Sequence, residues 1–446
     1  MTATEYDRWL PELLELMSIR SVGADPAEAE SMAAAARWLD TRLTALGAET
    51  ELVREGRESV LLASIPAQVW PETATTLLVY GHFDVQPIGD PEQWDSPPWE
   101  GTIRDGWLYG RGSIDTKGHL MMYLEALRAV LARGELRANV RLVIDGAEES
   151  GGELALDIMR ERHEGIDGVV IFDGPMIAKG RPAFYSAARG VLAYRLTLRT
   201  AARDLHSGQF GGAAMNALHV LVRVLSSVVP GPDGLLPEPL RAGIRPLPPE
   251  IVERLPELPT AEQLLGGEGS HPADEFVVDN MYTRLWSEPS LEVNGVSGGE
   301  TQVTHMVIPA VAEASLSLRL GPGQDPAAIA EALDGLLRAA LPPGAALEIE
   351  HRGSAPPALP PSEGPVLDVA REAFTEVIGT EPITVRAGGS LPLLSVFGDL
   401  GIPTVMTGMD LPEGNIHAPN ERLWLDHLPA GTAILERILS SARFTQ

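Results

Sequence analysis

The stretch TLLVYGHFDVQP, residues 76–87, determines the predicted fold. It begins with a mostly apolar run and then turns to polar side chains at His82 and Asp84. A short apolar run bounded by turn residues is typical of a buried strand, because it is too short for a helix. His82 and Asp84 are two residues apart, so in an extended segment they face the same side. An imidazole beside a carboxylate suits metal binding, although such a pair on its own is more often structural.

Two further apolar runs lead into acidic residues. Val140–Ile144 precedes Glu148 and Glu149, and Val169–Phe172 precedes Asp173. In open α/β sheets ligands bind outside the carboxyl ends of the strands, so we expect these groups to converge with His82 on one crevice. Taken singly, the paired glutamates also fit two solvated loop acids, and an aspartate before glycine also fits an ordinary turn.

The remaining chain alternates helical and strand patterns, which predicts an α/β protein. From Gly190 the expected order is strand, helix, strand, strand, helix, strand, the ferredoxin-like βαββαβ pattern, with a long Pro-rich insertion after its first helix. The α/β pattern resumes after Pro356. We therefore predict a mixed-sheet catalytic domain made of residues 1–188 and 355–446, into which a second domain of residues 189–354 is inserted.

The composition excludes several classes of partner and site. With 62 acidic and 34 basic residues the formal charge is −28, which disfavours nucleic acids and anionic membranes as partners. The chain has no cysteine, so any metal must be held by His, Asp or Glu. The first twenty residues do not resemble a signal peptide, and no apolar run reaches the roughly 18 residues of a membrane span. These features predict a cytoplasmic protein.

Two further motifs contribute possible ligands. GRGSIDTKG, residues 110–118, places Asp115 in a Gly-rich loop before a helical run, and NIHAPNER, residues 415–422, places His417 near the C-terminus. Either motif alone also fits a capped turn or a solvated loop. Together the candidates supply two imidazoles and three carboxylates, which suits two divalent ions that share one carboxylate. The candidate ligands are His82, Asp115, Glu149, Asp173 and His417.

These motifs together resemble the M20 family of metallopeptidases, and most of all its dipeptidase branch, which includes the carnosine dipeptidases. The resemblance spans residues 81–421 and rests on GHFDVQP, GRGSIDTKG, AEESGG (147–152), FDGP (172–175), DLHSG (204–208), RAGGS (386–390) and NIHAPNE. It departs from the commoner dipeptidase pattern at Gly174 and Pro175. The resemblance implies a Zn-peptidase-like catalytic domain, and an inserted domain that serves as the lid and as the dimerisation domain of a homodimer.

The same resemblance assigns a metal role to each candidate ligand. Asp115 would bridge two divalent ions, His82 and Asp173 would complete one site, and Glu149 and His417 would complete the other. Zn²⁺ is the expected metal, with Mn²⁺ as the alternative. The peptide bond that follows Asp115 would be cis.

The resemblance also implies catalytic and substrate-binding residues. Glu148 would be the general base, and Asp84 would orient His82. His206 would reach the active site of the partner subunit and polarise the scissile carbonyl. The substrate contacts implied are Arg319, for the substrate's carboxylate, together with Asn294 and Ser390.

The predicted reaction is hydrolysis of the peptide bond of dipeptides or very short peptides, by a water that bridges the two metals and is deprotonated by Glu148. An N-acyl amino acid deacylase of the same family would share every metal ligand and is the alternative enzyme. A catalytically silent metal-binding scaffold is the alternative from another class. The presence of Glu148, Asp84 and all five ligands disfavours that scaffold.

Overall fold

The computed structural model describes residues 9–267, 269–300, 302–303, 305–389 and 392–444. They divide into two compact units. The first contains the chain up to Ser186, Pro360–Val385 and Val396 onward, and the second contains Ala187–Leu359 and Arg386–Ser395. Arg386–Ser395 was expected in the catalytic domain. It clusters with the second unit, where the Arg386 guanidinium donates to the carbonyl oxygens of Trp286 and Pro246.

Within the described residues, the main sheet of the first unit has six strands in the order β1-β2-β6-β3-β7-β16. Strands β6, β3, β7 and β16 run parallel to their neighbours in that group, whereas β1 pairs antiparallel with β2, and β2 with β6. The bounds are β1 Glu49–Glu55, β2 Glu58–Ile65, β3 Thr76–His82, β6 Asn139–Asp145, β7 Gly168–Phe172 and β16 Thr404–Thr407. The predicted mixed α/β architecture is therefore confirmed.

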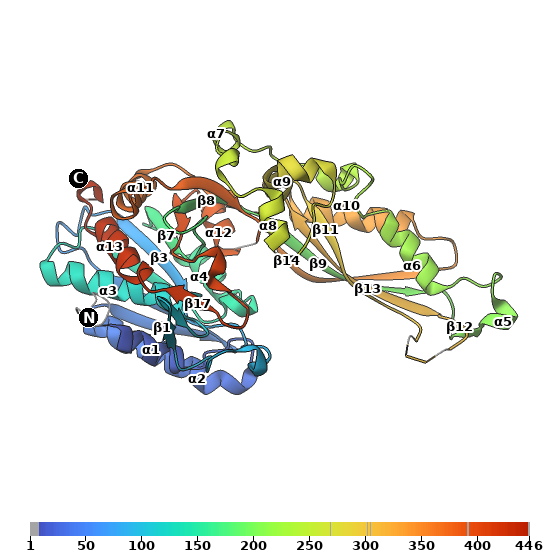
Figure 1. Ribbon diagram of the computed structural model, residues 1–446, viewed down its shortest axis with the longest axis horizontal. Coiled ribbons are helices and arrows are strands. Elements are labelled where there is room, and N and C mark those ends of the chain that lie inside the picture. The colour runs from blue at the N-terminus through green and yellow to red at the C-terminus, as the bar shows by residue number, and fades with distance from the viewer. Residues whose placement is uncertain (1–8, 268, 301, 304, 390–391, 445–446) are drawn as a thin grey trace. The chain divides into compact units, whose positions relative to one another are not determined.

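Alternate residues of these strands build one large hydrophobic core. Leu77 and Val79 of β3, and Val170 and Phe172 of β7, belong to the same buried cluster as residues from five helices. These helices are labelled in Figure 1. Because successive side chains of a strand point to opposite faces, this alternation places the cluster on one face of the sheet. The helices are α1 Leu10–Ser18, α2 Ala29–Ala45, α3 Lys117–Arg133, α11 Pro365–Ile378 and α13 His427–Leu439.

The turn that leads into α2 begins with a capping residue. The Asp25 side chain accepts a hydrogen bond from the amide of Ala27, and a short 3-10 turn leads directly into α2.

The other helices and strands that lie wholly or partly in the first unit are α4 Leu154–Arg162, α12 Pro392–Leu400, β4 Thr102–Arg104, β5 Trp107–Tyr109, β8 Ala183–Ala188, β15 Ile383–Ala387 and β17 Arg422–Trp424. Strand β17 pairs with β5 and β5 with β4, while β15 pairs with β8. None of these elements was predicted from the sequence.

The second unit contains a four-stranded antiparallel sheet in the order β11-β13-β9-β14. Two amphipathic helices, α6 and α10, share a hydrophobic core with alternate residues of β9 and β13. The bounds are β9 Gly190–Arg199, α6 Ala217–Ser226, β11 Ser290–Ser297, β13 Val311–Leu320, α10 Pro326–Ala339 and β14 Ala346–Ala355. Helix α6 begins after Asn216, whose side chain caps it by accepting from the amides of Leu218 and His219.

The Pro-rich insertion is more ordered than its composition suggests. It contains α7 Pro249–Val252, α8 Ala261–Gly267 and α9 Glu275–Ser287, of which α8 and α9 share a small apolar cluster. The short elements β10 Leu205–His206, α5 Ser207–Phe210 and β12 Val307–Ile308 complete the unit. No helix among the described residues has the length and apolar character needed to cross a bilayer.

Candidate metal centre

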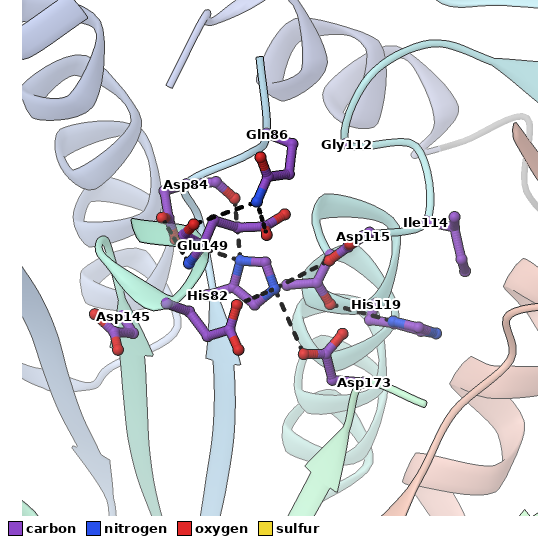
Figure 2. A network of polar contacts seen from close by, with 12 residues as sticks. His82, Asp84, Gln86, Gly112, Ile114, Asp115, His119, Asp145, Glu149 and Asp173 are labelled. Carbon is purple, nitrogen blue, oxygen red and sulfur yellow. Dashed lines mark hydrogen bonds and ion pairs between the residues drawn. The ribbon is translucent and has the colours of Figure 1, made fainter. Parts of the chain in front are cut away.

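The candidate ligands lie where the parallel strands of the first unit end. His82 is the last residue of β3, Glu149 lies in the turn that follows β6, and Asp173 comes directly after β7. Asp115 lies just before α3, and His417 lies in the loop between β16 and β17. The structure thus brings all five predicted ligands together, although they come from segments far apart in sequence. Figure 2 shows His82, Asp115, Glu149 and Asp173 of this set.

Asp115 joins two groups of possible ligands. Its Oδ1 lies 3.1 Å from His82 Nε2, while its Oδ2 lies 3.0 Å from His417 Nε2. Asp173 Oδ2 is 3.4 Å from His82 Nε2, and Glu149 Oε2 is 3.1 Å from His417 Nε2. Within each group the donor atoms lie within 4.8 Å of one another. One oxygen of the Asp115 carboxylate therefore faces each of the two groups of possible ligands.

The protonation state of His82 shows whether a cation fits between these possible metal-ligand atoms. Its Nδ1 lies 3.0 Å from the backbone carbonyl oxygen of Asp84, which can only accept, so Nδ1 carries the proton. In the neutral ring Nε2 then presents a lone pair, and this buried atom has no hydrogen-bond partner. A lone pair that faces carboxylate oxygens is repelled unless a proton or a metal cation lies between them. Imidazole nitrogen and carboxylate oxygen are ligands of divalent metals, so the residues fit the metal centre.

Without a metal, the excess of carboxylates shifts the protonation of the whole cluster. Burial opposes charge on His82, but Asp173 and Asp115 raise its pKa well above the ordinary value. Hydrogen bonds that the His417 ring donates to Asp115 and Glu149 raise its pKa to about 10. Burial, together with repulsion from Asp173 and the other acids, raises the pKa of Glu148 to about 8. Protons thus supply, in the metal-free protein, part of the positive charge that divalent ions would bring.

The candidate ligands are oriented by neighbouring polar groups. Asp84 holds His82 mainly through its backbone carbonyl, because its carboxylate lies 3.4 Å from Nδ1. The Asp84 carboxylate instead accepts the backbone amide of Glu149 at 3.1 Å. Gln86 donates to the Glu149 carboxylate at 2.7 Å, as Figure 2 shows. Sequence reasoning missed Gln86, although it lies in the quoted GHFDVQP motif.

The loop that carries Asp115 is held closely against its own helix. The peptide bond between Asp115 and Thr116 is cis, as the family resemblance implies. A Cβ atom at Gly118 would overlap the carbonyl oxygen of Ser113, so the loop requires glycine there. Lys117 is buried, and its Nζ donates to the carbonyl oxygens of Leu16 at 3.0 Å and Ile19 at 2.6 Å, near the end of α1. This anchoring contact is a role for Lys117 that the sequence did not suggest.

The remaining predicted site residues belong to the second unit. His206 is exposed on β10, where its Nδ1 accepts the amide of Gly208 at 3.0 Å. In the neutral ring this leaves Nε2–H as a donor. Arg319 lies on β13, paired with Ser290, and Asn294 lies at an irregularity of β11. Ser390 lies outside the described residues.

Comparison with known proteins agrees with this arrangement. Residues 78–441 match the model of peptidase family M20/M25/M40. The chain belongs to this family. Every candidate ligand of the M20 site lies within the matched range.

Relatives of this M20 chain include enzymes that act on short peptides. The cysteinylglycine-S-conjugate dipeptidase of Corynebacterium striatum is 30% identical, over 93% of this chain and 91% of the relative. The beta-Ala-His dipeptidase of Homo sapiens is 26% identical, over 94% and 86%. Among solved structures, the M20 family metallo-carboxypeptidase of Sulfolobus solfataricus has a TM-score of 0.86 and 28% identity, over 97% of this chain and 99% of that structure.

Proposed function

We propose that this M20 peptidase is a two-metal dipeptidase that hydrolyses the peptide bond of dipeptides or very short peptides. The observation that carries the proposal is the pair of ligand groups that share Asp115. The cysteinylglycine-S-conjugate and beta-Ala-His dipeptidases among its relatives support this class of substrate. An N-acyl amino acid deacylase would use the same ligands, but the relatives do not favour it.

His82, Asp115 and Asp173 would hold one divalent ion, and Asp115, Glu149 and His417 the other. Zn²⁺ is the first choice, because neutral imidazole and carboxylate are common zinc ligands, and Mn²⁺ is the alternative. Bound cations would supply positive charge that acidifies a water molecule and polarises the scissile carbonyl. Their charge would also favour the ionised form of Glu148.

Glu148 is the proposed general base. Its Oε2 lies 4.0 Å from His82 Nε2, and it belongs to neither ligand group, so its carboxylate is available for proton transfer. Ionised Glu148 would accept a proton from the attacking water and return it to the leaving amine. Gln86 hydrogen-bonds the neighbouring Glu149, which keeps that carboxylate in its ligand role.

The second unit is proposed to be a ferredoxin-like lid that pairs two copies of the chain in a homodimer. Its element order, βαββαβ, and its antiparallel sheet support that assignment. In the dimer, the partner subunit's His206 would donate through Nε2–H to the carbonyl oxygen of the substrate. Arg319 would bind the substrate's carboxylate, with Asn294 and Ser390 as further contacts. The cytoplasmic location stays a prediction from the sequence.

A substrate panel tests the reaction. The purified protein, depleted of metal and then reloaded with Zn²⁺ or Mn²⁺, is assayed with an unblocked dipeptide, the same dipeptide with a blocked N-terminus, a tripeptide and an N-acetyl amino acid. We expect the unblocked dipeptide to be cleaved fastest. Equal cleavage of the blocked dipeptide would identify a carboxypeptidase, as the Sulfolobus relative is named, and cleavage of the N-acetyl amino acid alone would identify a deacylase.

The Glu148→Ala variant tests the assignment of the base. It should keep its metal content while turnover falls by roughly 10²–10⁴-fold, because only proton transfer is removed. Exposed Glu153, just past the same turn, offers a matched control, and Glu153→Ala should change neither quantity. Unchanged turnover in Glu148→Ala would remove Glu148 from the mechanism.

A further inference from the structure

Arg111 and Glu421 form an ion pair that is closed off from solvent. Their side chains are 1% and 0% exposed, and Arg111 Nη1 lies 2.6 Å from Glu421 Oε2. Burial of two charges is costly unless both are well paired and hydrogen-bonded. The pair joins residues that are 310 positions apart in sequence. Its position beside the metal centre therefore calls for a specific role.

The Glu421 carboxylate holds the loop that carries Asp115. Its Oε2 accepts the amide of Gly112 at 3.1 Å in addition to Arg111. Its Oε1 accepts the amides of Ile114 at 3.2 Å and of Asp115 itself at 3.3 Å. Figure 2 shows how Gly112 and Ile114 follow the loop that leads to Asp115. Each carboxylate oxygen thus accepts two donors, and one donor is the backbone of the shared ligand.

The same pair also reaches two other ligand-bearing segments. Arg111 Nη2 donates to the carbonyl oxygen of Pro87 at 3.0 Å, at the end of the GHFDVQP stretch that begins next to His82. Glu421 lies four residues after His417, and its own carbonyl oxygen accepts the amide of Gly110 at 2.9 Å. Three segments that carry ligands therefore meet at one buried ion pair.

We propose that Arg111 and Glu421 are positioning residues that set the separation of His82, Asp115 and His417, and that they thereby control the affinity of both metal sites together. This inference rests on the proposed two-metal function. It adds two residues that bind neither metal nor substrate.

Glu421→Gln separates this role from simple space filling. Glutamine has nearly the same shape, but it has one acceptor oxygen in place of two, and its amide group would face backbone donors. The loop would lose two of its hydrogen bonds, and Arg111 would lose its counter-charge. Because Asp115 serves both metals, we expect the affinity of both sites to fall in parallel, by about 10–100-fold.

The experiment measures binding of Zn²⁺ alone to the metal-free protein, by competition with a chromophoric chelator, alongside thermal unfolding. The matched control is Glu125→Gln, since Glu125 is also about 1% exposed and pairs with an arginine, Arg128, on α3. The control should lose stability but keep both affinities. Glu421→Asp, which retains both acceptor oxygens on a shorter side chain, should recover part of the loss.

Several outcomes would overturn the proposal. If Glu421→Gln loses stability as Glu125→Gln does but binds two Zn²⁺ ions as tightly as the wild type, the pair is only structural. Weakening of a single site would contradict the common control of both. Should Glu421→Gln fail to fold, Arg111→Lys keeps the charge but changes the donor geometry, and the same comparison applies. Wild-type protein that does not bind two ions would instead contradict the proposed function.

Discussion

Proton release on metal binding is a quantitative consequence of the electrostatics of the site. In the metal-free protein at pH 7, both His82 and His417 should carry an extra proton, because neighbouring carboxylates raise the pKa of each imidazole. A ligand imidazole must be neutral, so binding of two ions displaces about two protons. Glu148, with a pKa of about 8 in the metal-free protein, is mostly protonated at pH 7, so it can release up to about one further proton as cations approach.

The pH dependence of metal affinity follows from the number of protons released, because proton release and metal binding are thermodynamically linked. Each proton displaced makes the overall binding constant tenfold weaker for every unit of pH decrease, which is about 1.4 kcal/mol. Where both imidazoles are protonated, their two protons make the product of the two association constants fall about 100-fold per unit of pH decrease, and release of the Glu148 proton adds up to about a further tenfold. Metal binding should weaken as pH falls, because acid favours the protonated, metal-free form.

Calorimetric titration of the metal-free protein with Zn²⁺ measures the number of protons released. The observed binding heat is measured at one pH in buffers with different ionisation enthalpies, and the slope of that heat against the ionisation enthalpy gives the number of protons released. His219, exposed on α6 in the second unit, provides the control, and His219→Ala should leave the slope unchanged. A slope near zero would refute the reasoning, because it would mean that both imidazoles are already neutral before the metals bind.

The structure makes three other predictions. The metal-free protein should become less stable as pH rises from about 6.5 toward 10. The pKa of His417 is about 10 in the folded protein and about 6.5 in the unfolded chain, so the stability that its proton contributes is complete below pH 6.5 and is lost as pH approaches 10. Thermal unfolding measured across this pH range checks the prediction. Phe172→Ala should cost about 3–5 kcal/mol in urea unfolding, because Phe172 is 0% exposed, whereas exposed Val278→Ala should stay within about 0.5 kcal/mol. Co-expressed His206→Ala and Glu148→Ala chains should recover up to about a quarter of wild-type dipeptidase activity if two-fold dimers share their sites, and no recovery would contradict the sharing.

The clustering of the candidate ligands could be predicted from the sequence because each of them lies in a local pattern. Apolar runs end directly before His82 and Asp173, and the parallel strands that these runs form share one edge. The side on which the ligands converge is therefore set by strand direction, which hydrophobic patterns reveal. Short strands such as β4 and β5 were missed because three residues are too few for a period to be seen.

The groups that orient the ligands could not be predicted in the same way. Glu421 is four residues from a ligand in a polar loop, and nothing local distinguishes a solvated glutamate from one that is fully buried. Its role depends on Arg111, 310 residues away. Asp84 was expected to orient His82 through its carboxylate, but the backbone carbonyl makes the closer contact, a distinction that only three-dimensional geometry supplies.

The two halves of the metal centre differ in how firmly the fold holds them. The His82 side chain is 1% exposed at the end of a core strand, so its position is fixed before any metal binds. The His417 side chain is 54% exposed, and its backbone has a φ of +60°, a left-handed conformation that costs a non-glycine residue about 1–2 kcal/mol. Such a conformation persists only where its surroundings impose it. The contacts of His417 with Asp115 and Glu149, those of Glu421 and the ligation of a metal would all help to maintain it, whereas His82 is supported by the sheet. Because Asp115 serves both halves and its amide donates to Glu421, the affinities of both halves should still fall together when Glu421 is replaced.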